Sequence, residues 1–244
     1  NQGITIGPRM VLCGRPMAII GGHMDYFGGE ATGPVEVRAL TRQLIKEGAD
    51  YIKITATGGT TRTSFKLRPS FNVDELKAIT NEAHKFGKLT ATHCTSTQGI
   101  INSLDADVDM ILHCRFRDVD GSDNFREDVA ERIAQEDKFV NPTLHIIRAT
   151  SWALQQKQQR ALTLQEQELV DSDQRKFEAM VKDCGRLIDM GVKVITGSDS
   201  SWSTYQRGNT TTFDRNIYFF YCFRVSFWIC ITYILKFYVT RINF

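Results

Sequence analysis

Residues 47–59 read EGADYIKITATGG, and this stretch says most about the fold. Gly48 ends a helical pattern, a β-prone run at 51–55 follows it, and a glycine-rich turn comes next. The same succession of helix, short strand and polar loop recurs from residue 17 to residue 196. Strands that alternate with helices favour a parallel sheet with right-handed crossovers, so the sequence predicts an α/β fold.

The apolar pattern places further elements on both sides of this stretch. Strands are expected at 17–20, 51–55, 88–93, 110–113, 139–141 and 192–196, and helices at 34–47, 73–86, 97–104, 125–135 and 172–190. Asn72 is predicted to cap the helix at 73–86, because Glu75 three residues later completes a capping-box pattern. Asn124 is predicted to cap the helix at 125–135, and residues 148–171 are interpreted as a polar helical excursion.

Four predicted strands carry, at or near their carboxyl ends, a residue able to hold a metal: Lys53, His93, His113 and Asp199. A parallel barrel gathers its strand ends on one face, where active sites lie. An open doubly wound sheet has the same rhythm of elements, but candidate ligands that recur at successive strand ends favour the barrel. We therefore expect a (β/α)8 TIM-type barrel and metal-assisted hydrolysis.

Lysine is normally a poor metal ligand because its ammonium group has no lone pair. A neutral Lys53 can instead react with carbon dioxide to form a carbamate, which would bridge two divalent metals roughly 3.5–4 Å apart. His93 and His113 would bind through neutral ring nitrogens. Asp199 would hold one metal and accept the proton of the attacking water.

The chain resembles the amidohydrolase superfamily, and within it the imidazolonepropionase-like and prolidase-like metal-dependent hydrolases. The matching segments, in family order over about residues 5–212, are GPR at 7–9, IIGGHMD at 19–25, EGADYIKITATGG at 47–59, LTATHCTSTQGI at 89–100, DMILHC at 109–114, NPTL at 141–144 and VITGSDSSW at 194–202. The resemblance implies two divalent metal ions of the zinc type and hydrolysis of the C–N bond of an amide, cyclic amide or peptide-like small molecule. It implies Lys53 as the carboxylated bridge, His93 and His113 as ligands, and Asp199 as ligand and base.

The resemblance and the loops also indicate substrate-binding residues. His23 matches a conspicuous histidine of the family whose role is substrate contact. Gly59 belongs to the turn at 57–60, which either cradles an anion or is simply a tight turn. Tyr205 and Arg207 follow Asp199 and would bind a substrate carboxylate.

Two departures from the family pattern divide the chain. No His-x-His strand occurs, so the sequence is expected to start after the first two barrel strands, with residues 1–212 forming a partial amidohydrolase barrel. Residues 213–244 are an atypical tail, dense in aromatic and β-branched side chains. Residues 217–235 are long enough to span a bilayer, but Arg224 interrupts them, and a non-native end is preferred to a membrane anchor.

Two other functions remain open at this stage. A Schiff-base aldolase would use Lys53 as a free amine that attacks a carbonyl, but it leaves the histidines and Asp199 without a joint role. A catalytically inactive fragment or a binding protein would account for the absence of His-x-His.

Composition limits the partners and the compartment. With 30 basic and 28 acidic residues, the net charge of +2 argues against a nucleic-acid surface. The six scattered cysteines form no CxxC pair, which argues against a zinc finger, and Cys94 and Cys114 are expected to be buried thiols rather than a disulfide. A reducing compartment such as the cytoplasm is the default, and a homo-oligomer stays open.

Overall fold

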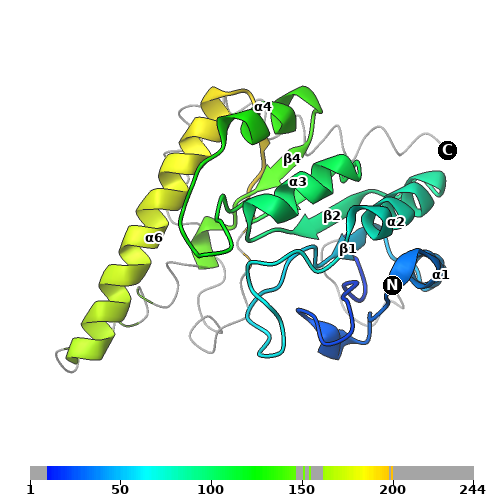
Figure 1. Ribbon diagram of the computed structural model, residues 1–244, viewed down its shortest axis with the longest axis horizontal. Coiled ribbons are helices and arrows are strands. Elements are labelled where there is room, and N and C mark those ends of the chain that lie inside the picture. The colour runs from blue at the N-terminus through cyan, green and yellow to red at the C-terminus, as the bar shows by residue number, and fades with distance from the viewer. Residues whose placement is uncertain (1–9, 147–150, 152–153, 155–161, 198, 200–244) are drawn as a thin grey trace. The chain divides into compact units, whose positions relative to one another are not determined.

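The computed structural model describes residues 10–146, 151, 154, 162–197 and 199. Within them a parallel sheet has the strand order β1-β2-β3-β4-β5, so each strand lies beside the next one in sequence (Figure 1). The strands are β1 Ile52–Ile54, β2 Thr90–His93, β3 Met110–Leu112, β4 Phe139–Asn141 and β5 Lys193–Val194. A doubly wound sheet reverses its strand order and a barrel does not, so the expected incomplete barrel is confirmed.

The chain divides into two compact units, which are described separately. The first unit comprises Asn1–Pro142 and Met180–Thr196 and contains the whole sheet, and the second comprises Thr143–Ala179 and Gly197–Phe244. The helices are α1 Gly33–Lys46, α2 Val73–Lys85, α3 Thr97–Asp105, α4 Glu127–Gln135 and α6 Leu164–Asp189, with a short 3₁₀ turn η1 at Asp25–Phe27. The last ten residues of α6 belong to the first unit and its earlier residues to the second.

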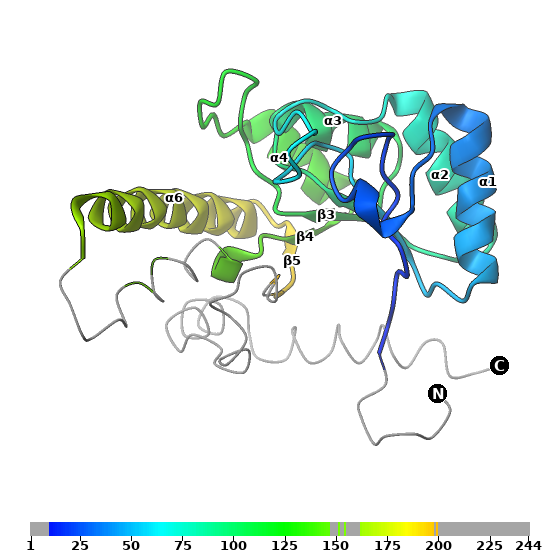
Figure 2. The ribbon, with the colours of Figure 1, turned by 90° about the horizontal axis from the view of Figure 1, so that it is seen from below.

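Helices α1–α4 lie on one side of the sheet (Figure 2). The strand side chains that face them are fully buried, among them Ile52, Ile54, Ile111 and Val140. In β1, β3 and β4 burial alternates, because neighbouring residues of a strand point to opposite faces. The residues between these apolar ones, including Lys53, therefore lie on the face that α1–α4 do not cover.

Some local predictions are confirmed and others are wrong. The capping box of α2 is present: Glu75 N donates to Asn72 Oδ1 at 2.9 Å, and Asn72 N donates to Glu75 Oε2 at 2.8 Å. Asn124 does not cap α4, which begins at Glu127 after Arg126, because the Asn124 amide donates to Asp118 Oδ2 instead. The strand expected at 17–20 is reduced to two isolated bridges, Met17 with Ile54 and Ala18 with Glu30.

The helix expected at 172–190 is longer than predicted, because it also takes in residues 164–171 of the segment interpreted as a polar helical excursion. Most of the rest of that segment lies outside the described residues. The helix begins at Leu164 because Thr163 and Glu166 form a reciprocal cap: Thr163 N donates to Glu166 Oε2 at 3.0 Å, and Glu166 N donates to Thr163 Oγ1 at 3.3 Å. The described residues contain no helix that is long and apolar enough to cross a bilayer. The tail at 213–244 lies outside the described residues.

Replacing Asn72 with alanine is expected to lower the free energy of unfolding by about 1 kcal/mol, because the backbone N–H of Glu75 in the first turn of α2 loses its side-chain acceptor. Urea denaturation followed by circular dichroism measures the change. Asn72→Ser keeps a side-chain acceptor and serves as the control, with an expected loss of only a few tenths of that value. Equal stability of the alanine variant and the parent would show that the capping box is energetically neutral.

Candidate functional site

Lys53 and His93 share the face of the sheet that α1–α4 leave uncovered. Lys53 lies at the centre of β1 and pairs in register with Ala91 of β2, and His93 lies two residues further along β2. Side chains two residues apart on a strand point the same way, so both project from this face. Lys53 is partly buried there, and His93 is only 8% exposed.

His113 reaches the same place through an unusual backbone conformation. It follows Leu112, the last residue of β3, so regular alternation would point it toward the helices with Ile111. Its φ of 66° is left-handed, as is the φ of 47° at Cys114, and this turns the chain. The His113 ring then lies 4.5 Å from the His93 ring, centroid to centroid. Strained backbone of this kind is characteristic of functional sites.

His23 joins the two histidines from the loop that precedes η1. Its ring centroid is 4.6 Å from that of His93, and the residue is only 6% exposed. Gly59 lies directly against the ring: a Cβ at Gly59 would be 2.4 Å from His23 Cδ2 and 2.5 Å from Nε2. The structure therefore places Gly59 beside His23, and only a residue without a side chain fits there. Its role in substrate binding stays a prediction.

All three imidazole rings are neutral near pH 7. Burial, with smaller contributions from Lys53, the His23 ring and Arg115, lowers the pKa of His113 to about 3. Burial and Lys53 lower the pKa of His23 to about 4, although Asp25 opposes them. Burial, His113 and Lys53 also hold the pKa of His93 well below its ordinary value. A neutral imidazole keeps a lone pair on one ring nitrogen, as a metal ligand must.

One hydrogen bond fixes which nitrogen of His93 carries that lone pair. His93 Nε2 lies 3.2 Å from the carbonyl oxygen of Gly58. A carbonyl only accepts, so Nε2 must donate and the lone pair is left on Nδ1. A backbone carbonyl that orients an imidazole in this way is the usual support of a metal-bound histidine. Gly58 is held in place in turn, because its N–H donates to Arg68 O at 3.2 Å.

The donor set suits a divalent metal only with a contribution from lysine. Two neutral imidazoles on one face are appropriate ligands. Among the residues that the structure describes, however, no three His, Cys, Asp or Glu side chains are grouped so as to hold a metal ion. Lys53 is near enough to His23, His93 and His113 to lower the pKa of each ring. A carbamate on Lys53 would supply the anionic oxygen ligand that the histidines lack.

The other predicted site residues, Asp199, Tyr205 and Arg207, do not belong to the first unit, which contains this cluster. Asp199 belongs to the second unit and has a left-handed φ of 49°, so its part in the site stays a prediction. Tyr205 and Arg207 lie outside the described residues. Sequence reasoning missed Thr61, whose hydroxyl contacts His23, because nothing in the sequence pairs the loop after β1 with the loop before η1.

The buried cysteines are confirmed as free thiols. Cys94 and Cys114 are buried, and Cys13 and Cys184 also form no disulfide. Burial raises the pKa of the Cys94 thiol, and it raises that of Cys114 well above its ordinary value. Both are therefore neutral side chains of the core rather than reactive thiolates.

Comparisons with known proteins place this geometry in a family. Ochratoxinase from Aspergillus niger is 27% identical over 144 residues, which are 48% of this chain and 30% of that protein. The crystal structure of a Xaa-Pro dipeptidase with bound methionine in its active site has 26% identity and a TM-score of 0.62, covering 81% of this chain and 49% of the dipeptidase. The crystal structure of A. niger ochratoxinase has 22% identity and a TM-score of 0.64, covering 80% of this chain and 47% of that chain, and it supports the fold alone.

The chain thus spans less than a third of the curated relative and about half of these solved structures. A sequence model described as the amidohydrolase family matches residues 1–227, which include every described residue of the cluster. The resemblance seen in the ordered motifs is confirmed, and the chain belongs to the amidohydrolase family.

Proposed function

We propose that the chain is part of a metal-dependent hydrolase that cleaves the C–N bond of an amide, a cyclic amide or a peptide-like substrate with a metal-activated water. The observation that carries the proposal is the convergence of Lys53, His93 and His113 on one face of the sheet, with both rings neutral. Family membership supports the reaction class, and the ochratoxinase and Xaa-Pro dipeptidase relatives support an amide or peptide-like bond.

Each residue of the cluster has a distinct role in this proposal. The neutral amine of Lys53 forms a bond to the carbon of carbon dioxide and releases one proton, which leaves a carbamate anion on the side chain. This anion and the His113 ring would hold two divalent metals together with His93 Nδ1. Nitrogen and oxygen ligands suit zinc, manganese, iron or cobalt, and zinc is the expected metal. When bound, such metals polarise a carbonyl and lower the pKa of water.

The other predicted residues act on the substrate and on protons. Asp199 would take the proton of the attacking water and serve as an additional ligand. His23 would contact an oxygen of the substrate, since its ring lies beside His93. Gly59 leaves the space in which this ring sits, and Tyr205 and Arg207 would bind a substrate carboxylate. The substrate is then a small molecule with an acceptor oxygen close to the scissile bond.

Metal content and hydrolysis of the purified full chain test the proposal together. We expect about two divalent metals per chain by elemental analysis, and release of product from Xaa-Pro dipeptides or from ochratoxin. Chelation should abolish the release, and zinc should restore it. Activity that survives chelation, with a substrate trapped on Lys53 by borohydride, would indicate the aldolase instead. A chain with neither metal nor turnover would be an inactive fragment.

A further inference from the structure

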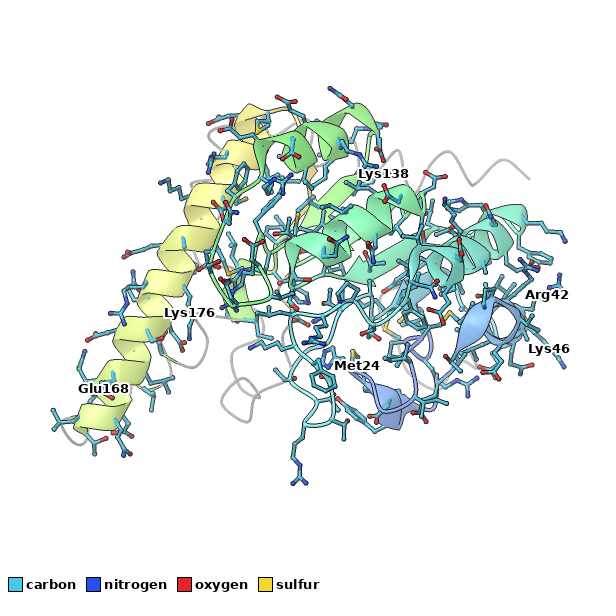
Figure 3. All side chains as sticks on the ribbon, viewed as in Figure 1. Met24, Arg42, Lys46, Lys138, Glu168 and Lys176 are labelled. Carbon is cyan, nitrogen blue, oxygen red and sulfur yellow. The ribbon has the colours of Figure 1, made fainter. Side chains whose placement is uncertain are left out.

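The hydroxyl of Thr61 joins two loops at the edge of the candidate site. Thr61 belongs to the segment between β1 and α2, and its Oγ1 lies 3.0 Å from His23 Nδ1. The backbone N–H of Met24 donates to the same oxygen, also at 3.0 Å. Met24, which Figure 3 labels, belongs to the loop before η1, and this loop lies beside the segment that follows β1. One side chain therefore holds both the backbone next to His23 and the ring itself.

The direction of these hydrogen bonds follows from the chemistry of the groups. A backbone N–H only donates, so Thr61 Oγ1 accepts from Met24 and keeps its own proton to donate. His23 Nδ1 is the one acceptor within reach of this hydroxyl in the described part of the chain. The hydroxyl proton can therefore be donated to Nδ1, and a neutral ring that accepts it there carries its own proton on Nε2.

The ring cannot easily turn over to escape this arrangement. Gly59 lies so close that a Cβ there would be 2.5 Å from Nε2 and 2.6 Å from Cε1. The His93 ring lies on a second side, 4.6 Å away between centroids. A flip of the ring would replace Nδ1 by a carbon opposite Thr61 and lose the hydrogen bond. Nε2 has no hydrogen-bond partner among the described residues, so its N–H remains available.

We propose that Thr61 is a positioning residue that fixes His23 as the Nε2–H tautomer, so that His23 donates a hydrogen bond to an oxygen of the substrate. This inference rests on the proposed function, in which His23 contacts the substrate. It adds the direction of the contact: the substrate group that meets His23 is an acceptor, either the carbonyl of the scissile amide or a carboxylate beside it. With the other tautomer, the Nε2 lone pair would repel such an oxygen.

The test compares Thr61→Val, which removes the hydroxyl at nearly constant volume, with Thr61→Ser, which keeps it. Thr63→Val, an exposed threonine of the same segment, is the matched control. Nitrogen-15 NMR of histidine side chains in the full chain near pH 7 reports the tautomer directly, without substrate. We expect Nε2–H for His23 in the parent, in Thr61→Ser and in Thr63→Val, and a mixture of tautomers in Thr61→Val.

The kinetic readout separates positioning from a general loss of structure. Thr61→Val should lower kcat/KM by about tenfold, the value of one well-directed hydrogen bond, and Thr61→Ser should restore most of it. The signal of His93, held by Gly58 O, should stay unchanged in every variant and reports that the site is intact. If Thr61→Val does not fold, the spectra of the parent and of Thr61→Ser still show which ring nitrogen of His23 carries the proton.

A parent spectrum with the proton on Nδ1 would overturn the proposal, and so would a folded Thr61→Val variant that keeps the parent tautomer of His23. Neither result bears on metal content or on hydrolysis by the parent chain. Conversely, a chain that binds no metal can still show the predicted tautomer. The failure of this inference and the failure of the proposed function are therefore distinguishable.

Discussion

Lys53→Ala in the full chain is expected to abolish binding of divalent metal and to lower hydrolysis by a thousandfold or more. The lysine carbamate would supply an anionic ligand to the two histidines, since among the residues that the structure describes no carboxylate or thiolate completes a three-residue group with them. Without it, two neutral imidazoles remain, which hold a metal only weakly. A bound metal contributes several kcal/mol of transition-state stabilisation, on the order of 10³ in rate.

Three controls separate the carbamate from other roles of this lysine. Lys53→Arg keeps a cation but cannot add carbon dioxide, so it should fail as completely as alanine if the carbamate is required. Lys77→Ala removes an exposed lysine of α2 and should leave metal content and activity unchanged. Intact-protein mass spectrometry of the parent under gentle conditions should show the added mass of one carbon dioxide, and Lys53→Ala should not.

Elemental analysis and single-turnover assays measure these effects. Two metals per chain retained in Lys53→Ala would exclude the bridging role. Wild-type metal content with normal activity in Lys53→Arg would assign the lysine a purely electrostatic role. If activity instead requires a free amine, borohydride should reduce a Schiff base on the parent and not on the alanine variant, which is the aldolase outcome.

The sequence was sufficient to predict the features that depend on short-range patterns. The sheet order follows from the alternation of strands and helices, and β4 was expected at the residues where it lies. The cap of α2 was readable because Asn72 and Glu75 are three residues apart. The convergence of Lys53 with His93 follows from parallel register and the two-residue period of strands.

Features that depend on contacts or backbone geometry outside the regular helix and strand patterns were not predictable. Asn124 has the side chain of an N-cap, but Asp118 accepts its amide in the folded loop. His113 contributes to the site only because its backbone is left-handed, and a histidine at that position gives no sign of it in the sequence. Thr61 contacts His23 across 38 residues of chain, which no local pattern encodes. In each case tertiary contacts, rather than intrinsic preference, decide the outcome.

Asp199→Asn is expected to lower kcat by about 10²–10⁴-fold, because an amide cannot take a proton from water as a general base does. The substitution is well matched in shape and in backbone preference. Asp199 has a φ of 49°, a conformation that asparagine and aspartate tolerate far better than most residues do. A loss of activity in the asparagine variant therefore reports the lost carboxylate and not a distorted turn.

Glycine and alanine variants of Asp199 test the alternative that this residue, which follows β5, is a simple turn residue. A turn residue would be replaced without loss by asparagine or glycine, which both accept the left-handed region, whereas alanine would cost about 1 kcal/mol of stability. A catalytic carboxylate would be replaced by none of the three, and activity would fall alike in all of them. Steady-state kinetics and urea denaturation of the three variants separate the two roles. If only the alanine variant loses activity, in step with its loss of stability, Asp199 has no part in the proposed chemistry. If all three variants lose activity alike, the carboxylate of Asp199 takes part in the reaction.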